Sequence, residues 1–379
     1  MSSLPQKNEE KKVEYIELVY DLIFVYIIGR NNLILHNTEG GFVSVTTFLA
    51  YVLSTLAIIQ IWNFSTFYIN MFGKNSIRNY VMLFINMYLL YFIGQSTRSD
   101  WQEYQNQYHV AWALIIINIG IQYILESREH KNNKELLKTI NHMMISLFGE
   151  AAIILIAIPV YNRFGIQIAL AAVLYGIIVT WIFADDEKAE LVDFTHLSER
   201  AMLYVVFSFG EMIIAIAEYF EGKFTLNLFY FSLMSFLIVA ALFLCYGLLY
   251  DRIINRELKT TGLVYMFIHI LLIFSMNNIT VALEFMRNEG VSITPKVLFL
   301  IISFLIFFTC IFLLMLFAKD RLKMCSKLIA RVAIISIIFV VLMLAFKSNM
   351  YVNIAITVIY AYSVFGSVFL YSRNFERQS

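Results

Sequence analysis

Three carboxyl side chains near the start of the chain are spaced so that they could hold a proton or a cation together. Glu14, Glu17 and Asp21 lie three and four residues apart, and a helical step of about 100° places such positions on one face. Like charges this close cannot all ionise cheaply away from water, so either one keeps a proton or a cation lies among them. The alternative is an acidic cap at a helix N-terminus, which suits Glu14 better than the more deeply placed Asp21.

The tripeptide Phe-Gly-Glu occurs twice in apolar sequence, at residues 148–150 and 209–211. This faint internal repeat carries two further acids, Glu150 and Glu211. A glycine directly before the acid lets a neighbouring helix come close, which could bring a partner group to the carboxyl. Ionisable side chains buried in a membrane are functional by default. The alternative is that both carboxyls are hydrogen-bonded only to hold helices together.

A compact charged group with the sequence His-Leu-Ser-Glu-Arg lies at residues 196–200. His196 and Arg200 are one helical turn apart, and Glu199 lies between them on an adjoining face. One interpretation is a helix start at a membrane interface, with Thr195 as the N-cap and Glu199 in the first turn.

The other interpretation assigns the charged group to the acids of the first segment. Arg200 would be the counter-ion of Asp21 or Glu17, and His196 would titrate near neutral pH. The residues alone leave both interpretations open.

A zinc site is a weaker hypothesis. His196 and Glu199 have a usable spacing for metal ligands, and Glu150 or Glu211 could complete the set. The sequence contains no H-E-x-x-H motif, no Gly-rich phosphate loop and no G-x-S-x-G elbow, which are the patterns that would indicate an enzyme. We therefore predict no metal ion, no cofactor and no catalytic residue.

The composition indicates what must position these residues. Of 379 residues, 60% are hydrophobic and 15% are charged, whereas a soluble domain carries about 25% charged residues. The excess of apolar residues must face lipid. The formal net charge is +1, and the basic residues lie in short loops, so nothing points to nucleic acid.

Runs of about 20 apolar residues, each able to cross about 30 Å of hydrocarbon, predict an all-α polytopic transmembrane helical bundle of about twelve spans. Residues 1–13 form an N-terminal segment, 14–372 a single transmembrane domain and 373–379 a C-terminal tail. The predicted spans are 14–34, 43–68, 77–95, 108–125, 140–158, 165–184, 201–219, 226–250, 261–285, 296–318, 328–346 and 351–372.

The distribution of lysine and arginine predicts the orientation of the bundle, because these residues concentrate on the cytoplasmic side of a membrane. With the twelve spans, the two termini and the loops on their side hold 21 of the 28 basic residues, and the opposite loops hold 7. Both termini are therefore predicted to be cytoplasmic.

Other polar and aromatic residues in or near the spans are secondary features. His142, His269 and Glu284 are secondary candidates for a functional site, although a lone histidine in a span is more often a hydrogen-bonded structural residue. Aromatic residues near the span ends, among them Trp62 and Tyr68, are expected to form interfacial belts.

Two motifs resemble a known family. Residues 17–25, Glu-Leu-Val-Tyr-Asp-Leu-Ile-Phe-Val, resemble the E-L-x-x-D-L-x-F-V signature of the bacterial low temperature requirement A proteins. Residues 196–200, together with Gly-Glu and Ile-Ile-Ala-Ile within 210–216, are similar to the family's H-L-x-E-R to G-E-x-I-I-A-I segment. The chain has Met212 where the family commonly has a small hydroxyl residue. The resemblance implies a multi-pass protein of the bacterial plasma membrane and supplies no assigned catalytic residues.

Three classes of function fit these features. The first is proton- or cation-coupled transport of a small solute or ion, with Asp21, Glu150 and Glu211 binding and releasing the coupling ion near the bilayer midplane. The second is a membrane-embedded enzyme acting on lipids or polyprenyl carriers, with His196, Glu199 and Glu211 as acid, base or metal ligands. The third is a sensor or scaffold whose buried ion pairs fix helix packing. The expected partners are the lipid bilayer and a small solute or ion, and a homo-oligomer is left open.

Overall fold

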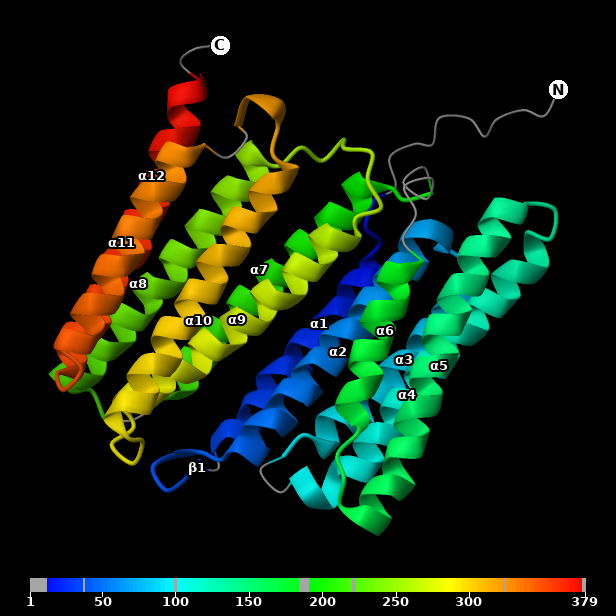
Figure 1. The fold of residues 1–379 in the computed structure, drawn as a ribbon, viewed down its shortest axis with the longest axis horizontal. Coiled ribbons are helices and arrows are strands. Elements are labelled where there is room, and N and C mark those ends of the chain that lie inside the picture. Colours follow the sequence, from blue (N-terminus) through cyan, green and yellow to red (C-terminus); the bar gives the residue numbers. More distant parts are fainter. Residues whose placement is uncertain are drawn as a thin grey trace. The chain divides into compact units, whose positions relative to one another are not determined.

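The computed structural model describes residues 12–36, 38–98, 101–183, 191–219, 223–322 and 325–376. This part of the chain forms twelve α-helices (Figure 1). Their bounds are α1 Tyr15–Asn31, α2 Val45–Phe72, α3 Ile77–Ser96, α4 Trp101–Glu129, α5 Lys134–Phe164, α6 Ala169–Ile182, α7 Phe194–Tyr219, α8 Leu226–Leu248, α9 Leu263–Arg287, α10 Ile293–Leu314, α11 Ser326–Ala345 and α12 Met350–Glu376.

Short elements join some of these helices. Strands β1 (Thr38–Glu39) and β2 (Phe42–Val43) pair antiparallel around a two-glycine turn. A π-helical turn, Leu249–Ile253, extends α8. Turns of 3₁₀-helix lie at Asn32–His36, Met315–Phe317 and Asp320–Leu322.

The predicted all-α membrane bundle is confirmed, because each predicted span corresponds to one of these helices. In the described residues, eleven helices are long and apolar enough to cross a membrane. The sixth, α6, has 14 residues, fewer than the roughly 20 that a spanning helix needs. It is short because α5 ends at Gly165, which has a φ of +70°, and the chain is not helical again until Ala169.

Several helices extend beyond the predicted apolar spans. α4 begins at Trp101 and not at residue 108, and α5 covers Lys134–Phe164 and not 140–158, so that Pro159 lies inside it. α7 begins at Phe194 and not at residue 201. Hydropathy detects the lipid-facing stretch, whereas a helix continues through polar turns when its ends are capped. Asn133, for example, caps α5 by accepting a hydrogen bond from Leu136 N at 3.1 Å.

The chain divides into two compact units. Unit 1 comprises Met1–Ile34, Thr46–Tyr204 and Arg256–Met266, and unit 2 comprises Leu35–Val45, Val205–Asn255 and Phe267–Ser379. The single transmembrane domain expected for residues 14–372 covers both units and stays a prediction. In unit 1, α4 packs against α3 and α5, and α5 packs against α6; in unit 2, α12 packs against α8 and α11.

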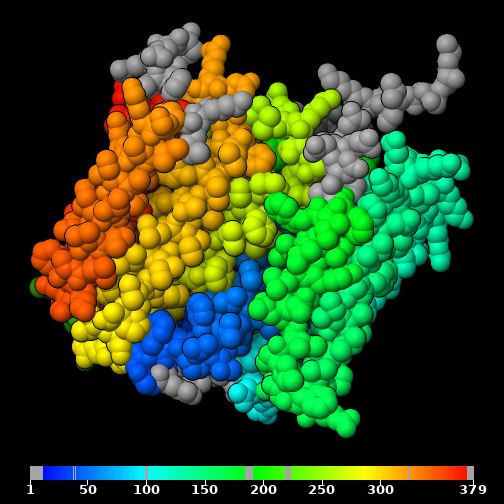
Figure 2. All heavy atoms as spheres, in the orientation of Figure 1, coloured from blue at the N-terminus to red at the C-terminus, as the bar shows by residue number. Residues whose placement is uncertain are grey.

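Apolar side chains cover the outside of the helices. On α11, for example, Ile334, Ile337 and Val341 are each more than half exposed, and Figure 2 shows this helix in orange on the surface of the drawn face. Polar side chains lie in the interior instead, as expected for a protein that is solvated by lipid.

Candidate functional site

A buried ion pair joins α1 to α7 in unit 1. Arg200 Nη2 donates a hydrogen bond to Asp21 Oδ1, and Trp62 Nε1 of α2 donates to the same oxygen at 2.8 Å. Asp21, Trp62 and Arg200 are all fully buried. Charges withdrawn from water this completely persist only when they are paired and hydrogen-bonded.

Glu17 and His196 extend this pair by one helical turn. Glu17 Oε2 lies 3.4 Å from Arg200 Nε and 3.4 Å from His196 Nε2. Glu17 is 4% exposed and His196 is fully buried. The structure therefore brings together Glu17, Asp21, His196 and Arg200, which we call the α1–α7 cluster, and Arg200 serves both carboxyls.

Asn70 of α2 fixes the orientation of the histidine ring. Its Nδ2 donates to the carbonyl oxygen of Asp193 at 2.8 Å, and its Oδ1 accepts from Asp193 N at 3.0 Å. Because a carbonyl only accepts and a backbone N–H only donates, these two bonds determine which end of the amide is which. Nδ2 then lies 3.1 Å from His196 Nδ1. Nδ1 is therefore the acceptor, and the ring proton lies on Nε2, which faces Glu17.

The charges of the cluster follow from this tautomer. With Nδ1 accepting a hydrogen bond, His196 is neutral. The guanidinium of Arg200 is then the one positive charge of the cluster, and it lies beside two carboxyls. Their charges sum to −1 when both carboxyls are ionised and to zero when Glu17 binds a proton or a monovalent cation. The cluster can thus exist in two charge states that differ by one bound ion.

The predicted helix start at Thr195 is wrong in detail. α7 begins at Phe194, and Asp193 Oδ1 accepts a hydrogen bond from His196 N at 3.0 Å, as an N-cap side chain does. Thr195 Oγ1 instead donates to Arg256 O at 3.0 Å. Glu199 is half-buried and forms no ion pair in the described part of the chain. The cluster residues therefore lie inside the helix and not at its cap.

Glu150 occupies a second buried position in unit 1, without a positive charge beside it. Gln60 Nε2 of α2 donates to Glu150 Oε2 at 3.1 Å, and Glu150 is fully buried. The glycine before it allows the close approach that was predicted, because a Cβ at Gly149 would lie 2.2 Å from Tyr175 Oη of α6.

The second copy of the repeat does not behave in the same way. In the described part of the chain, a Cβ at Gly210 would meet nothing within 4 Å, so the predicted close approach beside Glu211 is not seen there. Glu211 is half-buried and belongs to unit 2. The two tripeptides therefore have different surroundings, because Tyr175 lies against Gly149 and no described side chain lies against Gly210.

A fourth buried carboxyl, that of Glu126 on α4, is not predicted by the sequence patterns. Arg78 of α3 forms ion pairs with Glu126 and Glu129, and Tyr68 Oη of α2 donates to Glu126 Oε1 at 3.2 Å. Glu126 is fully buried although it follows the predicted span, which ended at residue 125. Its distance of four residues from His130, whose Nδ1 lies 3.6 Å from Glu126 Oε2, is a signal that could have identified it.

The role of α2 was also missed. Gln60, Trp62 and Tyr68 each donate a hydrogen bond to a buried carboxyl, on α5, α1 and α4 respectively. Trp62 and Tyr68 had been assigned to an interfacial belt, but they are 0% and 2% exposed. Nothing in the type of an aromatic residue shows whether it faces lipid or a buried acid.

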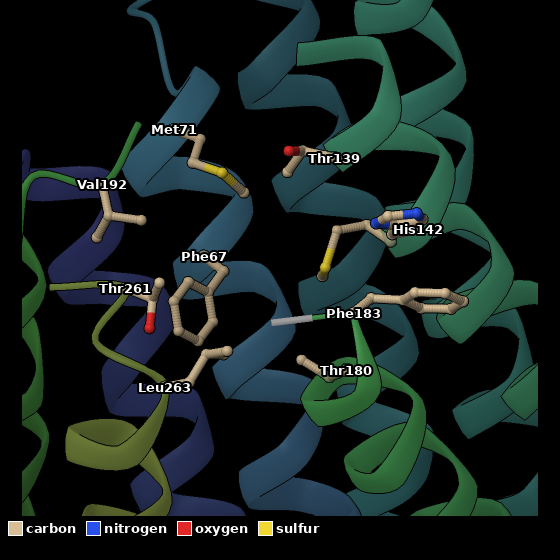
Figure 3. Close-up of a pocket in the computed structure, with 10 residues that line it drawn as sticks. Phe67, Met71, Thr139, His142, Thr180, Phe183, Val192, Thr261 and Leu263 are labelled. Carbon is tan, nitrogen blue, oxygen red and sulfur yellow. The ribbon is translucent and has the colours of Figure 1, made fainter. Parts of the chain in front are cut away.

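His142 lies beside a small pocket in unit 1. Its ring stacks on that of Phe183 with centroids 4.1 Å apart, as Figure 3 shows. The pocket holds about 50 Å³ and is lined by residues of α2, α5, α6 and α9 and of the segments next to these helices, most of them apolar. The lining residues are Phe67, Met71, Thr139, His142, Met143, Thr180, Phe183, Val192, Thr261 and Leu263.

The remaining candidates lie in unit 2, apart from the residues described above. His269 Nε2 of α9 lies 3.0 Å from Tyr246 Oη of α8. Glu284 pairs with His36, with 2.9 Å between His36 Nε2 and Glu284 Oε2. The zinc hypothesis finds no support in the geometry, because no group of three or more His, Cys, Asp or Glu side chains in the described residues could hold a metal ion.

Comparison with known proteins supports the family suggested by the two motifs. The family model described as bacterial low temperature requirement A protein (LtrA) matches residues 12–364 of the 379. No curated protein and no solved structure matched the chain in the same comparisons. The match covers both motifs and, among the described helices able to span a membrane, all except the C-terminal end of α12. This multi-pass membrane protein therefore belongs to the bacterial low temperature requirement A family.

Proposed function

We propose that this protein transports a small solute or ion across the bacterial plasma membrane and couples the movement to protons or other cations. The observation that carries the proposal is the buried contact between Glu17 Oε2 and His196 Nε2, which lie 3.4 Å apart. Ionisable groups buried within a membrane protein are usually those that bind the transported or coupling ion.

Binding of one proton at Glu17 changes the forces between α1 and α7. A new O–H bond forms at the carboxyl, and the summed charge of the cluster changes from −1 to zero. The attraction between Glu17 and Arg200 Nε, 3.4 Å apart, then loses its ionic part, whereas Asp21 remains paired with Arg200. A monovalent cation beside Glu17 would balance the charge in a similar way. Either event favours a different packing of the two helices, as alternating access requires.

The test is ion flux into proteoliposomes that contain the purified protein. We expect a proton or sodium gradient to drive flux in the wild type, and we expect the Glu17→Gln variant to lose it at equal protein density. Glu17→Gln keeps the shape of the side chain and leaves Asp21 and Arg200 balanced, so it should fold. Glu199→Gln is the matched control, because Glu199 is half-buried on α7 and forms no ion pair in the described residues.

Two results would contradict the proposal. Absence of flux in the wild type under any gradient would favour a lipid-processing enzyme or a sensor. Flux that is unchanged in Glu17→Gln would show that the α1–α7 cluster only stabilises the fold. In the proposal the protein needs the surrounding lipid and a solute or ion as partners, and it needs no nucleic acid.

A further inference from the structure

Glu150 differs from the other buried carboxyls because no cationic side chain pairs with it in the described part of the chain. Asp21 has Arg200, and Glu126 has Arg78. Glu150 instead receives one amide hydrogen bond from Gln60. No positive charge compensates a carboxylate in such surroundings. Ionising Glu150 therefore costs the full free energy of removing the charged group from water.

The amide of Gln60 has a fixed direction. Its Nε2 also donates to Val173 O of α6 at 3.2 Å, and a carbonyl oxygen only accepts, so the amino end of Gln60 faces Glu150. Glu150 Oε2 is therefore an acceptor. Glu150 Oε1 and Gln60 Oε1 are buried and have no hydrogen-bond partner in the described residues.

The space around this carboxyl is limited on the side of α6. A Cβ at Gly176 would lie 2.0 Å from Glu150 Oε2 and 2.3 Å from Gln60 Nε2. Only glycine at this position lets α6 approach the two side chains. The backbone of α6 thus lies close to Glu150 Oε2 and Gln60 Nε2.

Side chains of α4 and α6 lie on the other sides of Glu150. On α4, Trp112 lies close to the carboxyl of Glu150. His109, one turn before it, has its ring 6.2 Å from that of Trp112, and neither of its nitrogens has a hydrogen-bond partner in the described residues. On α6, Tyr175 donates to Ile145 O at 3.2 Å. No acid or base among these groups forms an ion pair with Glu150.

We propose that Glu150 binds a single proton and no metal cation, and that Gln60 and Gly176 are its positioning residues. The step is simple: a proton adds to the carboxylate, one O–H bond forms, and the charge of the side chain changes from −1 to zero. A sodium or calcium ion requires several oxygen ligands. Here the amide presents its N–H group to the carboxyl, and a proton is the cation that fits this geometry. The inference rests on the proposed transport function, and it identifies the proton as the coupling ion at this site.

The experiment is a pH titration of the purified full-length protein by infrared difference spectroscopy. We expect the wild type to show a carboxylic-acid C=O band that grows as the pH falls and that is missing from Glu150→Gln. Sodium, potassium and calcium should leave the band unchanged. Glu150→Gln keeps the shape of the side chain, and its folding can be checked by gel filtration and circular dichroism.

A second pair of variants tests the positioning residues. Gly176→Ala should move the band assigned to Glu150, because the added methyl group displaces the carboxyl from Gln60. Gly247→Ala is the matched control: Gly247 lies in α8, and a Cβ there would meet nothing within 4 Å. It should leave the band unchanged.

The proposal would be overturned by a Glu150 band that shifts when sodium is added, by a band that is constant over the whole pH range, or by no band lost in Glu150→Gln. These outcomes are separate from the failure of the proposed function. A titrating Glu150 band in a protein that shows no flux would support the proton site and contradict transport. Flux without such a band would support transport and contradict the proton site.

Discussion

At the scale of single residues, Asp21 and Arg200 depend on each other more than any other pair in the α1–α7 cluster. Both are fully buried, and Asp21 Oδ1 accepts hydrogen bonds from Arg200 and Trp62. Removing one partner of a buried ion pair costs about 3–5 kcal/mol, because the other charge loses its compensation. The two carboxyls of the cluster should therefore respond differently to neutralisation.

We predict that Asp21→Asn lowers the free energy of unfolding by about 3 kcal/mol, whereas Glu17→Gln changes it by less than about 1 kcal/mol. The physical reason is that Asp21→Asn removes the closest anion of Arg200, and Glu17→Gln retains it. Thermal unfolding of the purified variants in one detergent would measure both. An equal loss of stability in the two variants would contradict the prediction.

The sequence could predict part of this cluster. The spacing of Glu17 and Asp21 and the adjoining His196 and Arg200 indicated two charged faces that could pair. Their partners on α2 could not be predicted in the same way, because a tryptophan or an asparagine in a span is equally compatible with lipid contact, helix packing or hydrogen bonding to an acid. Only the arrangement of the helices distinguishes these roles.

At the scale of elements, α2 links three helices of unit 1 by donating hydrogen bonds to a buried carboxyl on each. Residues 60, 62 and 68 point in different directions around a helix with 3.6 residues per turn, so α2 needs neighbours on several sides. This explains why the polar residues of α2 lie on several faces of the helix and do not form one polar stripe.

A double-mutant cycle between α2 and α5 tests this link. We predict that Gln60→Leu alone destabilises the protein by about 1–3 kcal/mol, because it leaves Glu150 buried without a donor. Adding Glu150→Leu should restore part of the loss, since an apolar pair leaves no unsatisfied group. A coupling energy of about 1 kcal/mol or more, measured by unfolding of the four proteins, is the expected result. Strictly additive effects would show that the hydrogen bond contributes nothing.

The sequence predicts which segments form helices better than it predicts where each helix begins and ends. Each apolar stretch produced a helix, because a membrane leaves a spanning backbone few alternatives. The ends could not be predicted from apolar content, because side-chain caps such as Asp193 before α7 lie in polar sequence. This is why the segment 196–200 could be interpreted as a helix start at an interface, although it lies within the first turns of α7.

At the scale of the whole molecule, the family match runs through both compact units. The buried carboxyls with the clearest geometry, Asp21, Glu126 and Glu150, all lie in unit 1. Glu211 was predicted to be equivalent to Glu150 on the basis of a tripeptide, and the different surroundings of the two glycines show that three residues cannot define an environment built by other helices.

The orientation of the whole bundle in the membrane, with both termini in the cytoplasm, is a further prediction. With 21 of 28 basic residues on one side, reporter enzymes fused after residue 379 and at the N-terminus should both report the cytoplasm. A fusion in the loop that follows α5 should report the opposite side. A C-terminal fusion that reports the opposite side would contradict an even number of crossings.

The short helix α6 has a consequence for the lipid around Glu150. Its 14 residues extend about 21 Å at 1.5 Å per residue, against about 30 Å of hydrocarbon. Hydrophobic mismatch of this kind is relieved when the bilayer thins locally or when the helix shifts. Because Gly176 of α6 lies against Glu150 and Gln60, acyl-chain length and lipid order become physical variables that act directly on the surroundings of a buried carboxyl.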